Sequence, residues 1–484
     1  MLATADIALS LETGSVRSLP PSATVKPRFT LDGSEELERH LDRTCQSVLA
    51  GVQSIVPERK LEALLLGGGY GRGEGGVLKT ETGEGIRKRD LSAGDKEVER
   101  RSPAPPLPGE RAGVRAILHP SVLTVDKPYN DLEFYVFLRG NTLLNERRYR
   151  AALHDLAERL TPGAGVEVEF KILSLPKLRR SPATMFYYDL MMGHRWLRGE
   201  ESLLASCEHH REAKNIPLSE ATRLLMNRCT GLLFARERLQ RAPFTAQDAD
   251  FVGRNLAKAQ LAFGDSVLTA FGQYHWSCRE RNRRLNRLVA DEDLPWLPEV
   301  QRQHGEAVEF KLHPRRGTAS STELQKQHAK LTALGLQLWL WLEWRRLKRS
   351  FASARDYALC PINKCPEANA WRNRLVNVKT FGPSAFFAPR ASRYPRERLL
   401  HTLALLLWEA ATFETPGARP SWAQQLRALW NAANSSRTCL AANAMRPGRP
   451  RSGLLKFVQG ELRTTARTFS DLIAAYAALW RRFN

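Results

Sequence analysis

Residues 64–78 read LLLGGGYGRGEGGVL, an apolar run followed by seven glycines around a single arginine. Glycine loses much backbone entropy on folding, so this density is normally found where the backbone adopts positive φ or where another group approaches it closely. The preceding run LEALLL has the length and composition of a short strand. We therefore predict a strand that enters a glycine loop, with another group lying against that loop.

Two acid-bearing strands are predicted downstream of the loop. In VLTVDKPYNDLEFYVFLRG the side chains alternate, and a period of two places one set on each face of a strand. The first set is Asp131, Glu133, Tyr135 and Phe137, and the second is Leu132, Phe134, Val136 and Leu138. An amphipathic helix is predicted in ERRYRAALHDLAERL, and a further strand in VEVEFKIL. Together with a helix in SEELERHLDRTCQSVLAGVQSIV, these elements indicate a small domain of helices and strands.

Composition divides the chain into segments. Residues 1–30 mix Ser, Thr, Pro and Val without a period and are predicted to form a disordered tail. Residues 31–200 hold the predicted strands, interrupted at about 79–116 by a charged, proline-rich insertion that is predicted to be disordered. Residues 201–484 contain long periodic segments rich in Leu, Ala, Arg and Trp, which are typical of helices. The sequence thus predicts an α+β protein, a small mixed-sheet domain followed by a mostly α-helical domain.

The chain of 484 residues carries a formal net charge of +22, from 73 Lys and Arg against 51 Asp and Glu. This excess favours polyanionic partners such as nucleic acid or nucleotides, whereas an arginine-rich background scattered over the chain is the alternative. Seven cysteines, an odd number, are not typical of a disulfide framework, so we expect a reducing, cytoplasmic location. The N-terminus does not resemble a secretory signal. Polar residues interrupt the longest apolar stretches, so no membrane segment is predicted.

The glycine loop and the acids predict one chemical assembly. Successive N–H groups of a glycine loop that opens a helix form an anion site suited to phosphate. Arg72 is a candidate for a second phosphate contact or, equally, for an ion pair with Glu74 or a helix end. Asp131 and Glu133, two apart on a strand, point the same way and are candidate ligands of a divalent cation, typically magnesium. The alternative is a solvated strand face.

A third carboxylate completes most two-metal transfer sites, where it binds the metal nearest the attacking oxygen and helps to take its proton. The segment VEVEF offers Glu167 and Glu169 on one face of the next strand, and their spacing does not choose between them. Glu167, with valine on both sides, is favoured, and Glu169 is the close alternative.

This ordered set of motifs resembles the DNA polymerase beta superfamily of nucleotidyltransferases. The set comprises a strand, the loop GGYGRGEGG, the strand DLEF and the strand VEV, and the later segment SPATMFYYDLMMGHRWLRGEESLL resembles the helix and short strand that follow in smaller bacterial members. The resemblance implies a short helix at the glycine pair that holds the triphosphate, two magnesium or manganese ions on the first two acids, and a third acid that activates the acceptor hydroxyl. The implied nucleotide-binding residues are Gly68, Gly69, Tyr70, Gly71, Arg72 and Gly73. The implied metal ligands are Asp131, Glu133, Glu167 and Glu169, the first three being catalytic.

The sequence departs from the common pattern of that superfamily at three positions. Gly69 stands where many members have serine, and Glu133 and Glu167 replace the commoner aspartate. Each glutamate adds a methylene, which shifts the position at which a metal is held.

The resemblance implies transfer of a nucleoside monophosphate from an NTP to a hydroxyl of RNA, a protein or a small molecule. The alternative is a catalytically weak module of the same fold that binds a nucleic acid or protein partner through its basic helical domain, as in toxin–antitoxin systems. A dinucleotide-binding fold is disfavoured because the literal GxGxxG at Gly71 is followed by a charged insertion rather than a long helix.

Three further patterns are interpreted more simply. Trp339, Trp341 and Trp344 are predicted to pack in the core rather than to stack on bases. The cysteine and histidine pairs lack the partners of a zinc site, so none is predicted. Lys258 lies on a predicted helix and is a weak candidate for a phosphate contact above the site.

Overall fold

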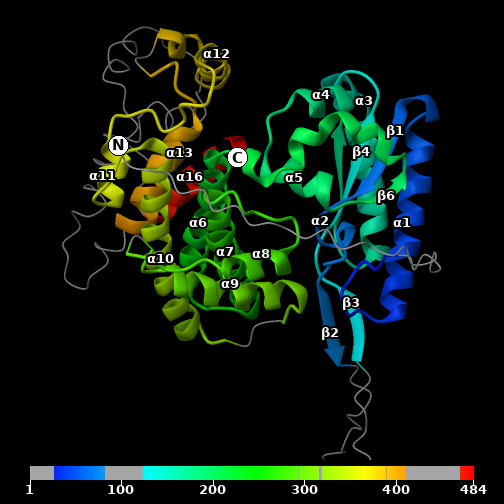
Figure 1. Ribbon diagram of the computed structural model, residues 1–484, viewed down its shortest axis with the longest axis horizontal. Coiled ribbons are helices and arrows are strands. Elements are labelled where there is room, and N and C mark those ends of the chain that lie inside the picture. The colour runs from blue at the N-terminus through cyan, green and yellow to red at the C-terminus, as the bar shows by residue number, and fades with distance from the viewer. Residues whose placement is uncertain are drawn as a thin grey trace, which may run out of the picture.

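The computed structural model describes residues 27–81, 124–292, 294–315, 319–387, 390–409 and 469–483. In Figure 1 the strands and the helices around them lie on the right, and the remaining helices lie on the left. We call residues 27–216 the sheet half and residues 217–483 the helical half. A small mixed sheet combined with many helices confirms the predicted α+β class.

The main sheet has four strands in the order β5-β4-β1-β6. Strand β4 pairs in parallel with β5, and β1 pairs antiparallel with both β4 and β6. A parallel pair needs a crossover connection, which helix α3 supplies between β4 and β5. The strands are β1 (Leu61–Leu66), β4 (Leu132–Leu138), β5 (Val168–Leu173) and β6 (Arg195–Arg198).

Helices cover both faces of this sheet. Helices α1 (Glu35–Ile55) and α3 (Thr142–Ala164) bury one face, where Leu132 and Phe134 are fully inaccessible to solvent. Helices α4 (Leu175–Arg180), α5 (Met185–Met192) and the 3-10 helix η2 (Glu201–His210) bury the other face against Phe137. The predicted alternation along β4 is therefore confirmed. Burying each large apolar side chain stabilises the fold by about 1.5–3 kcal/mol.

The structure differs from the sequence-based boundaries at two places. Phe29, assigned to the tail, is buried, and its carbonyl accepts a hydrogen bond from Gly75. The start of the insertion forms β2 (Val77–Glu81), which pairs antiparallel with β3 (Thr124–Pro128) as a separate ribbon. Val77 of this ribbon is buried in the core that α1 and α3 share with the main sheet, so the ribbon is anchored at that end. Residues 1–26 of the predicted tail and 82–116 of the predicted insertion lie outside the described residues.

The helical half is built around α6, α7 and α10, which share one apolar cluster. Capping boxes at Thr245 and Ser320 fix the starts of α7 and α10. Its α-helices are α6 (Leu218–Leu239), α7 (Ala246–Ala270), α8 (Cys278–Leu285), α9 (Leu297–Leu312), α10 (Ser321–Leu347), α11 (Ala354–Leu359), α12 (Ala370–Phe381), α13 (Arg396–Ala404) and α16 (Phe469–Phe483). Its shorter turns are the 3-10 helix η4 (Pro383–Phe387) and the π-helix η5 (Leu405–Glu409), whereas the 3-10 helices η1 (Glu58–Lys60) and η3 (Ala213–Asn215) belong to the sheet half.

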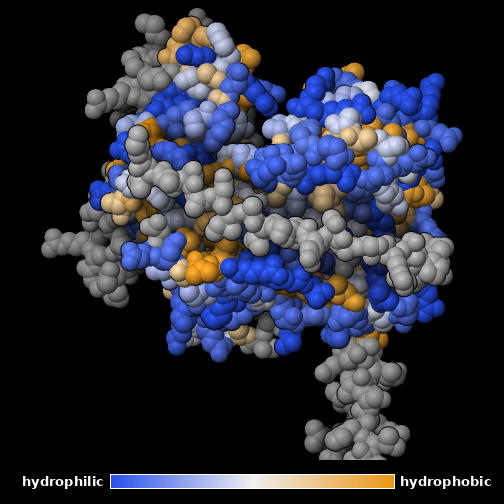
Figure 2. Space-filling model, in the orientation of Figure 1, coloured by the Kyte–Doolittle hydropathy of each residue, from blue (hydrophilic) through white to orange (hydrophobic). Residues whose placement is uncertain are grey.

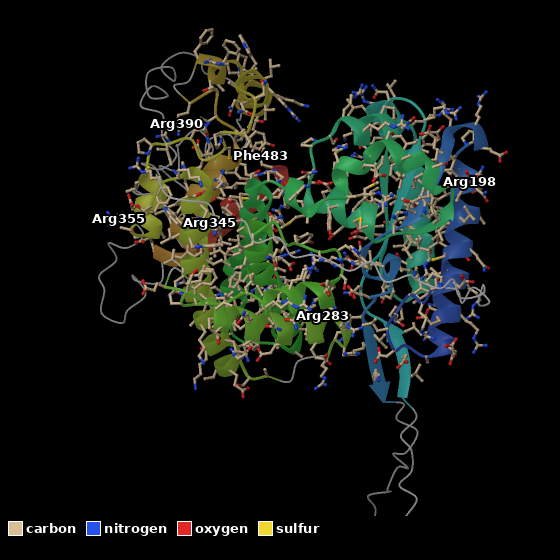
Figure 3. All side chains as sticks on the ribbon, viewed as in Figure 1. Arg198, Arg283, Arg345, Arg355, Arg390 and Phe483 are labelled. Atoms are coloured by element: carbon tan, nitrogen blue, oxygen red, sulfur yellow. The ribbon has the colours of Figure 1, made fainter. Side chains whose placement is uncertain are left out.

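Two predictions about the helical half can be compared with this structure. Trp339 and Trp341 are buried as expected, whereas the side chain of Trp344 is 44% exposed. No helix within the described ranges is long and apolar enough to cross a bilayer. Basic side chains are scattered over both halves, as the labelled arginines in Figure 3 illustrate.

Candidate active site

The glycine loop is shaped by two different requirements. Strand β1 ends at Leu66, and the one-turn helix α2 (Gly68–Gly71) follows, with Gly68 at φ +62°. A side chain at Gly68 would lie 3.7 Å from the carboxyl carbon of Glu133, so the loop passes directly against this acid. A side chain at Gly75 would lie 2.0 Å from the Tyr70 ring, which has no room to move. Part of the glycine density therefore serves internal packing rather than a ligand.

Tyr70 belongs to this internal packing. Its side chain is fully buried, and its hydroxyl donates to the Gly76 carbonyl and accepts from the Tyr129 N–H, both at 2.9 Å. Burial raises the pKa of Tyr70 to about 12. The predicted nucleotide-binding residue thus connects the loop to the segment that leads into Asp131, and its ring faces the protein interior.

Arg72 is also directed away from the acids. Its Nη1 donates to the Trp276 carbonyl at 3.0 Å and lies 3.3 Å from Asp189 Oδ2, and the side chain is only 10% exposed. Burial lowers the pKa of Arg72, but the Asp189 carboxylate outweighs this effect, and the pKa is raised. The geometry favours the ion-pair alternative over a phosphate contact, with a partner that the sequence did not suggest.

The four predicted acids gather at the start of two parallel strands. Glu133 is the register partner of Glu169, and the Leu132 N–H donates to the Glu167 carbonyl at 2.8 Å. Asp131 and Glu167 immediately precede their strands. The pKa of Glu169 is raised, first by burial and then by repulsion from the other three carboxylates, against the opposing effect of Lys171. The acids therefore act on one another electrostatically.

Lys171 divides these acids into two pairs. Its Nζ lies 3.4 Å from Glu133 Oε2 and 3.7 Å from Glu169 Oε2, and the Tyr135 hydroxyl donates to Glu133 at 2.5 Å. Asp131 and Glu167 make no ion pair with any residue in the described ranges. In the same part of the chain, no group of three or more His, Cys, Asp or Glu side chains is arranged to hold a metal ion.

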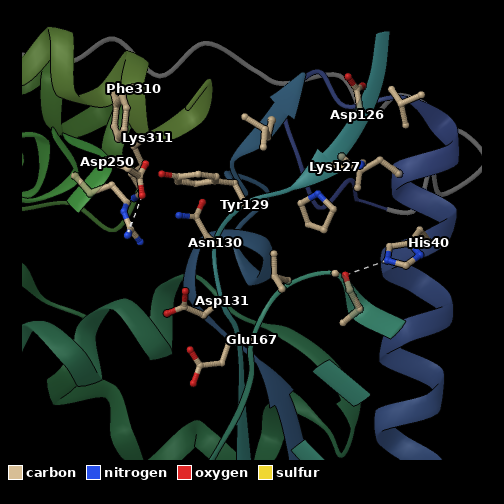
Figure 4. A pocket seen from close by; sticks show the side chains of 18 of the residues that line it. His40, Asp126, Lys127, Tyr129, Asn130, Asp131, Glu167, Asp250, Phe310 and Lys311 are labelled. Atoms are coloured by element: carbon tan, nitrogen blue, oxygen red, sulfur yellow. Dashed lines mark hydrogen bonds and ion pairs between the residues drawn. The ribbon is translucent and has the colours of Figure 1, made fainter. Parts of the chain in front are cut away.

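A cavity of about 1010 Å³ opens beside Asp131 and Glu167. Its walls come from α1, β3 and the loop before β5 on one side and from α7 and α9 on the other. Figure 4 shows both carboxylates pointing away from His40 of α1, and Asp250 and Lys311 projecting from the helical half. The glycine loop, Glu133 and Glu169 lie outside the lining of this cavity. Two of the four acids therefore line the same cavity as residues of the helical half.

Three cations line the helical wall of the cavity: Arg254 and Lys258 of α7, and Lys311 of α9. Enclosure and the neighbouring Arg228 lower the pKa of Lys258, whereas Asp131 raises it. Lys258 and Asp131 line the same cavity, and a phosphate contact of Lys258 stays a prediction. Lys311 and Arg254 were not predicted, because neither lies in a motif.

The loop also connects the two halves. The Glu74 carboxylate accepts from the Ser277 hydroxyl at 2.5 Å and from the Cys278 N–H at 2.9 Å, at the start of α8. Glu74 is 4% exposed, so these are buried, charge-assisted hydrogen bonds. They fix the helical half relative to the loop, and so hold α7 and α9 opposite the acids.

Comparison of the chain with protein-family models, with curated proteins and with solved structures gave no match.

Proposed function

We propose that the protein is a nucleotidyltransferase of the DNA polymerase beta type, which moves a nucleoside monophosphate from an NTP to a hydroxyl acceptor and releases pyrophosphate. The observation that carries this proposal is that Asp131 and Glu167, at the starts of two parallel strands, line one cavity with Lys258. Carboxylates that make no ion pair but share a cavity with a lysine suit a ligand that brings both a metal ion and phosphates.

A divalent cation fits the donor chemistry of this site in part. Carboxylate oxygens are the ligands that magnesium prefers, and Asp131 and Glu167 are open to it. Glu133 has the right chemistry but is held by Lys171 and Tyr135. Asp131 and Glu133, with Glu167, would hold the ion, with Glu169 as the alternative third acid. A bound ion would neutralise charge on the triphosphate.

The chain's own residues would then have distinct roles. The backbone of Gly68 passes against Glu133 and, together with that of Gly69, would cradle phosphate oxygens. Lys258 would attract the phosphates across the cavity and orient them, since positioning and electrostatic stabilisation supply most of the catalysis in phosphoryl transfer. Glu167 would accept the proton of the acceptor hydroxyl.

The test is label transfer from each α-labelled NTP, with magnesium or manganese, onto cell RNA, protein and small-molecule extracts. Wild type is expected to transfer label, and Asp131→Asn and Glu167→Gln to lose at least about 100-fold of it, because each removes a carboxylate that would hold the ion. Asp155→Asn, an exposed acid of α3, is the matched control. Transfer that survives Asp131→Asn would refute the proposal.

A second candidate is a binding module that keeps this architecture but transfers little. The contact of Lys171 with both Glu133 and Glu169 favours it, because an ammonium group lies where a cation would otherwise bridge the two acids. In that case neither label transfer nor metal-dependent NTP binding is expected.

A further inference from the structure

Helix α12 buries polar side chains and exposes apolar ones. Its buried side chains are polar: Asn373 donates to the Ser392 carbonyl at 2.8 Å, and Asn377 donates to the carbonyls of Ala391 and Arg393 at 2.9 Å. Its outer face carries Trp371, which is 67% exposed, and Leu375, which is 63% exposed. A surface helix normally buries its apolar side chains and exposes its polar ones.

Aromatic side chains extend this exposed face. The rings of Trp371 and Phe386 lie 6.1 Å apart, and those of Phe386 and Phe387 lie 5.2 Å apart. Phe387 is 86% exposed. The Arg374 guanidinium lies 5.5 Å from the centre of the Phe386 ring and donates to the Phe386 carbonyl at 3.0 Å, so it fixes η4 against α12. The fold thus holds these rings in place, although those of Trp371 and Phe387 are mostly exposed.

Positive charge is interleaved with these rings. Arg372 and Lys379 are exposed on the same helix as Trp371. Residues 366–398 contain seven Lys and Arg but only two Glu. In Figure 2 the end of the molecule that carries α12, at the upper left, shows hydrophobic surface broken by hydrophilic surface. We call Trp371, Arg372, Leu375, Lys379 and Phe387 the α12 patch.

We propose that the α12 patch binds single-stranded nucleic acid. Exposed rings supply platforms on which unpaired bases stack, and the interleaved cations pair with the phosphates between those bases. The charge complementarity is general as well as local, because the whole chain carries a formal net charge of +22. The interleaving argues against a lipid surface, which an uninterrupted apolar face suits better. The α12 patch lies apart from the cavity beside Asp131, so this inference goes beyond the proposed transfer reaction and does not depend on it.

The experiment is fluorescence anisotropy of the full chain with labelled 15-nucleotide single strands of RNA and DNA, at several salt concentrations. We expect binding that weakens about tenfold or more in the double variant Trp371→Ala, Phe387→Ala, because two stacking platforms are lost. Trp344→Ala, an exposed tryptophan of α10, is the matched control and should bind as wild type does. Arg372→Gln with Lys379→Gln should reduce the slope of log affinity against log salt by about 1.4, the value for two phosphate contacts on a single strand.

The outcomes separate this proposal from its competitors and from the proposed reaction. Asp131→Asn should bind the single strands as wild type does, so a failure of catalysis leaves this test intact. Each of three results would overturn the inference: no binding by wild type, equal binding by the double variant, or a preference for anionic lipid vesicles that the double variant loses. Because the substituted side chains are exposed, circular dichroism should show the double variant folded.

Discussion

One site in each half of the molecule shows how differently charges are treated. In the helical half, Glu343 is 1% exposed and lies 2.7 Å from Arg346, and Asp265 lies 3.1 Å from Arg281. In the sheet half, Asp131 and Glu167 are exposed beside a cavity and make no ion pair with the residues that the structure describes. Paired charges of the first kind hold the fold together. Unpaired charges of the second kind do not, and so are available to a ligand.

The largest effect should come from breaking a buried pair. Glu343 accepts hydrogen bonds from Thr222 and Tyr357 as well as from Arg346. We expect Glu343→Gln to lower the free energy of unfolding by about 3–5 kcal/mol, because it leaves the Arg346 charge buried without its partner. Asp131→Asn should change it by no more than about 0.5 kcal/mol. Urea denaturation measures both, and equal losses would erase the contrast between the halves.

Lys364 of the helical half is a buried cation whose neighbours stabilise its charge only in part. It is fully buried, and burial lowers its pKa to about 8, although Glu397 opposes the shift. Between pH 8 and about 10.5, the pKa of this lysine in the unfolded chain, the unfolded chain holds a proton that the folded protein lacks. The free energy of unfolding should therefore rise with pH, by about 2–3 kcal/mol in all. Lys364→Met should abolish this rise. Unfolding curves from pH 8 to 10 measure the free energy of unfolding of both proteins. The same rise with pH in wild type and Lys364→Met would contradict the assignment.

Glu74 joins the halves and should give a smaller effect. Burial raises its pKa, but the hydrogen bonds from Ser277 and Cys278 outweigh burial, and the pKa is lowered. The stabilisation is therefore present above about pH 4.5 and is lost as pH falls through the lowered pKa. Glu74→Gln should lower the free energy of unfolding by about 1–2 kcal/mol at pH 7 and should reduce the loss of stability at acidic pH. Thermal unfolding from pH 3 to 7 tests this, and an unchanged loss of stability at acidic pH would argue against a buried carboxylate here.

The smallest effect concerns Lys171, whose ammonium group lies near both Glu133 and Glu169. Lys171→Met removes the attraction between this ammonium group and the two glutamates, which is worth about 1 kcal/mol after solvent screening. Mn²⁺ would no longer compete with that charge, so the affinity for Mn²⁺ should rise about fivefold. The exposed Lys177 of α4, changed in the same way, controls for net charge. Calorimetric titration with Mn²⁺ alone measures both. Weaker binding in Lys171→Met would mean that Lys171 helps to hold the ligand.

The sequence predicted the elements of the site better than their contacts. Alternation along 131–138 was sufficient to place Asp131 and Glu133 at the start of a buried strand, since every apolar residue of one face is in the core. The partner of Arg72 was not predictable, because Asp189 is distant in sequence and only the fold brings it close. Lys171 was missed because its role arises from strand register, which pairs Glu133 with Glu169 and leaves the ammonium between them.

The choice between Glu167 and Glu169 shows the same limit. Both lie on one face by parity, and the sequence favoured Glu167 only through its neighbours. The structure gives a physical distinction: Glu167 lines the cavity with Asp131, whereas Glu169 lies beside Lys171. Their relative importance stays a prediction, and Glu167→Gln against Glu169→Gln compares them directly.

The most direct test of the central claim is calorimetric binding of an NTP analogue that cannot be cleaved at the α-phosphate, with and without magnesium. If the unpaired acids form the ligand site, wild type and Asp155→Asn bind the analogue only when the metal is present, and Asp131→Asn and Glu167→Gln lose that binding. Binding that needs no metal and survives both substitutions, or no binding by wild type, would contradict the account.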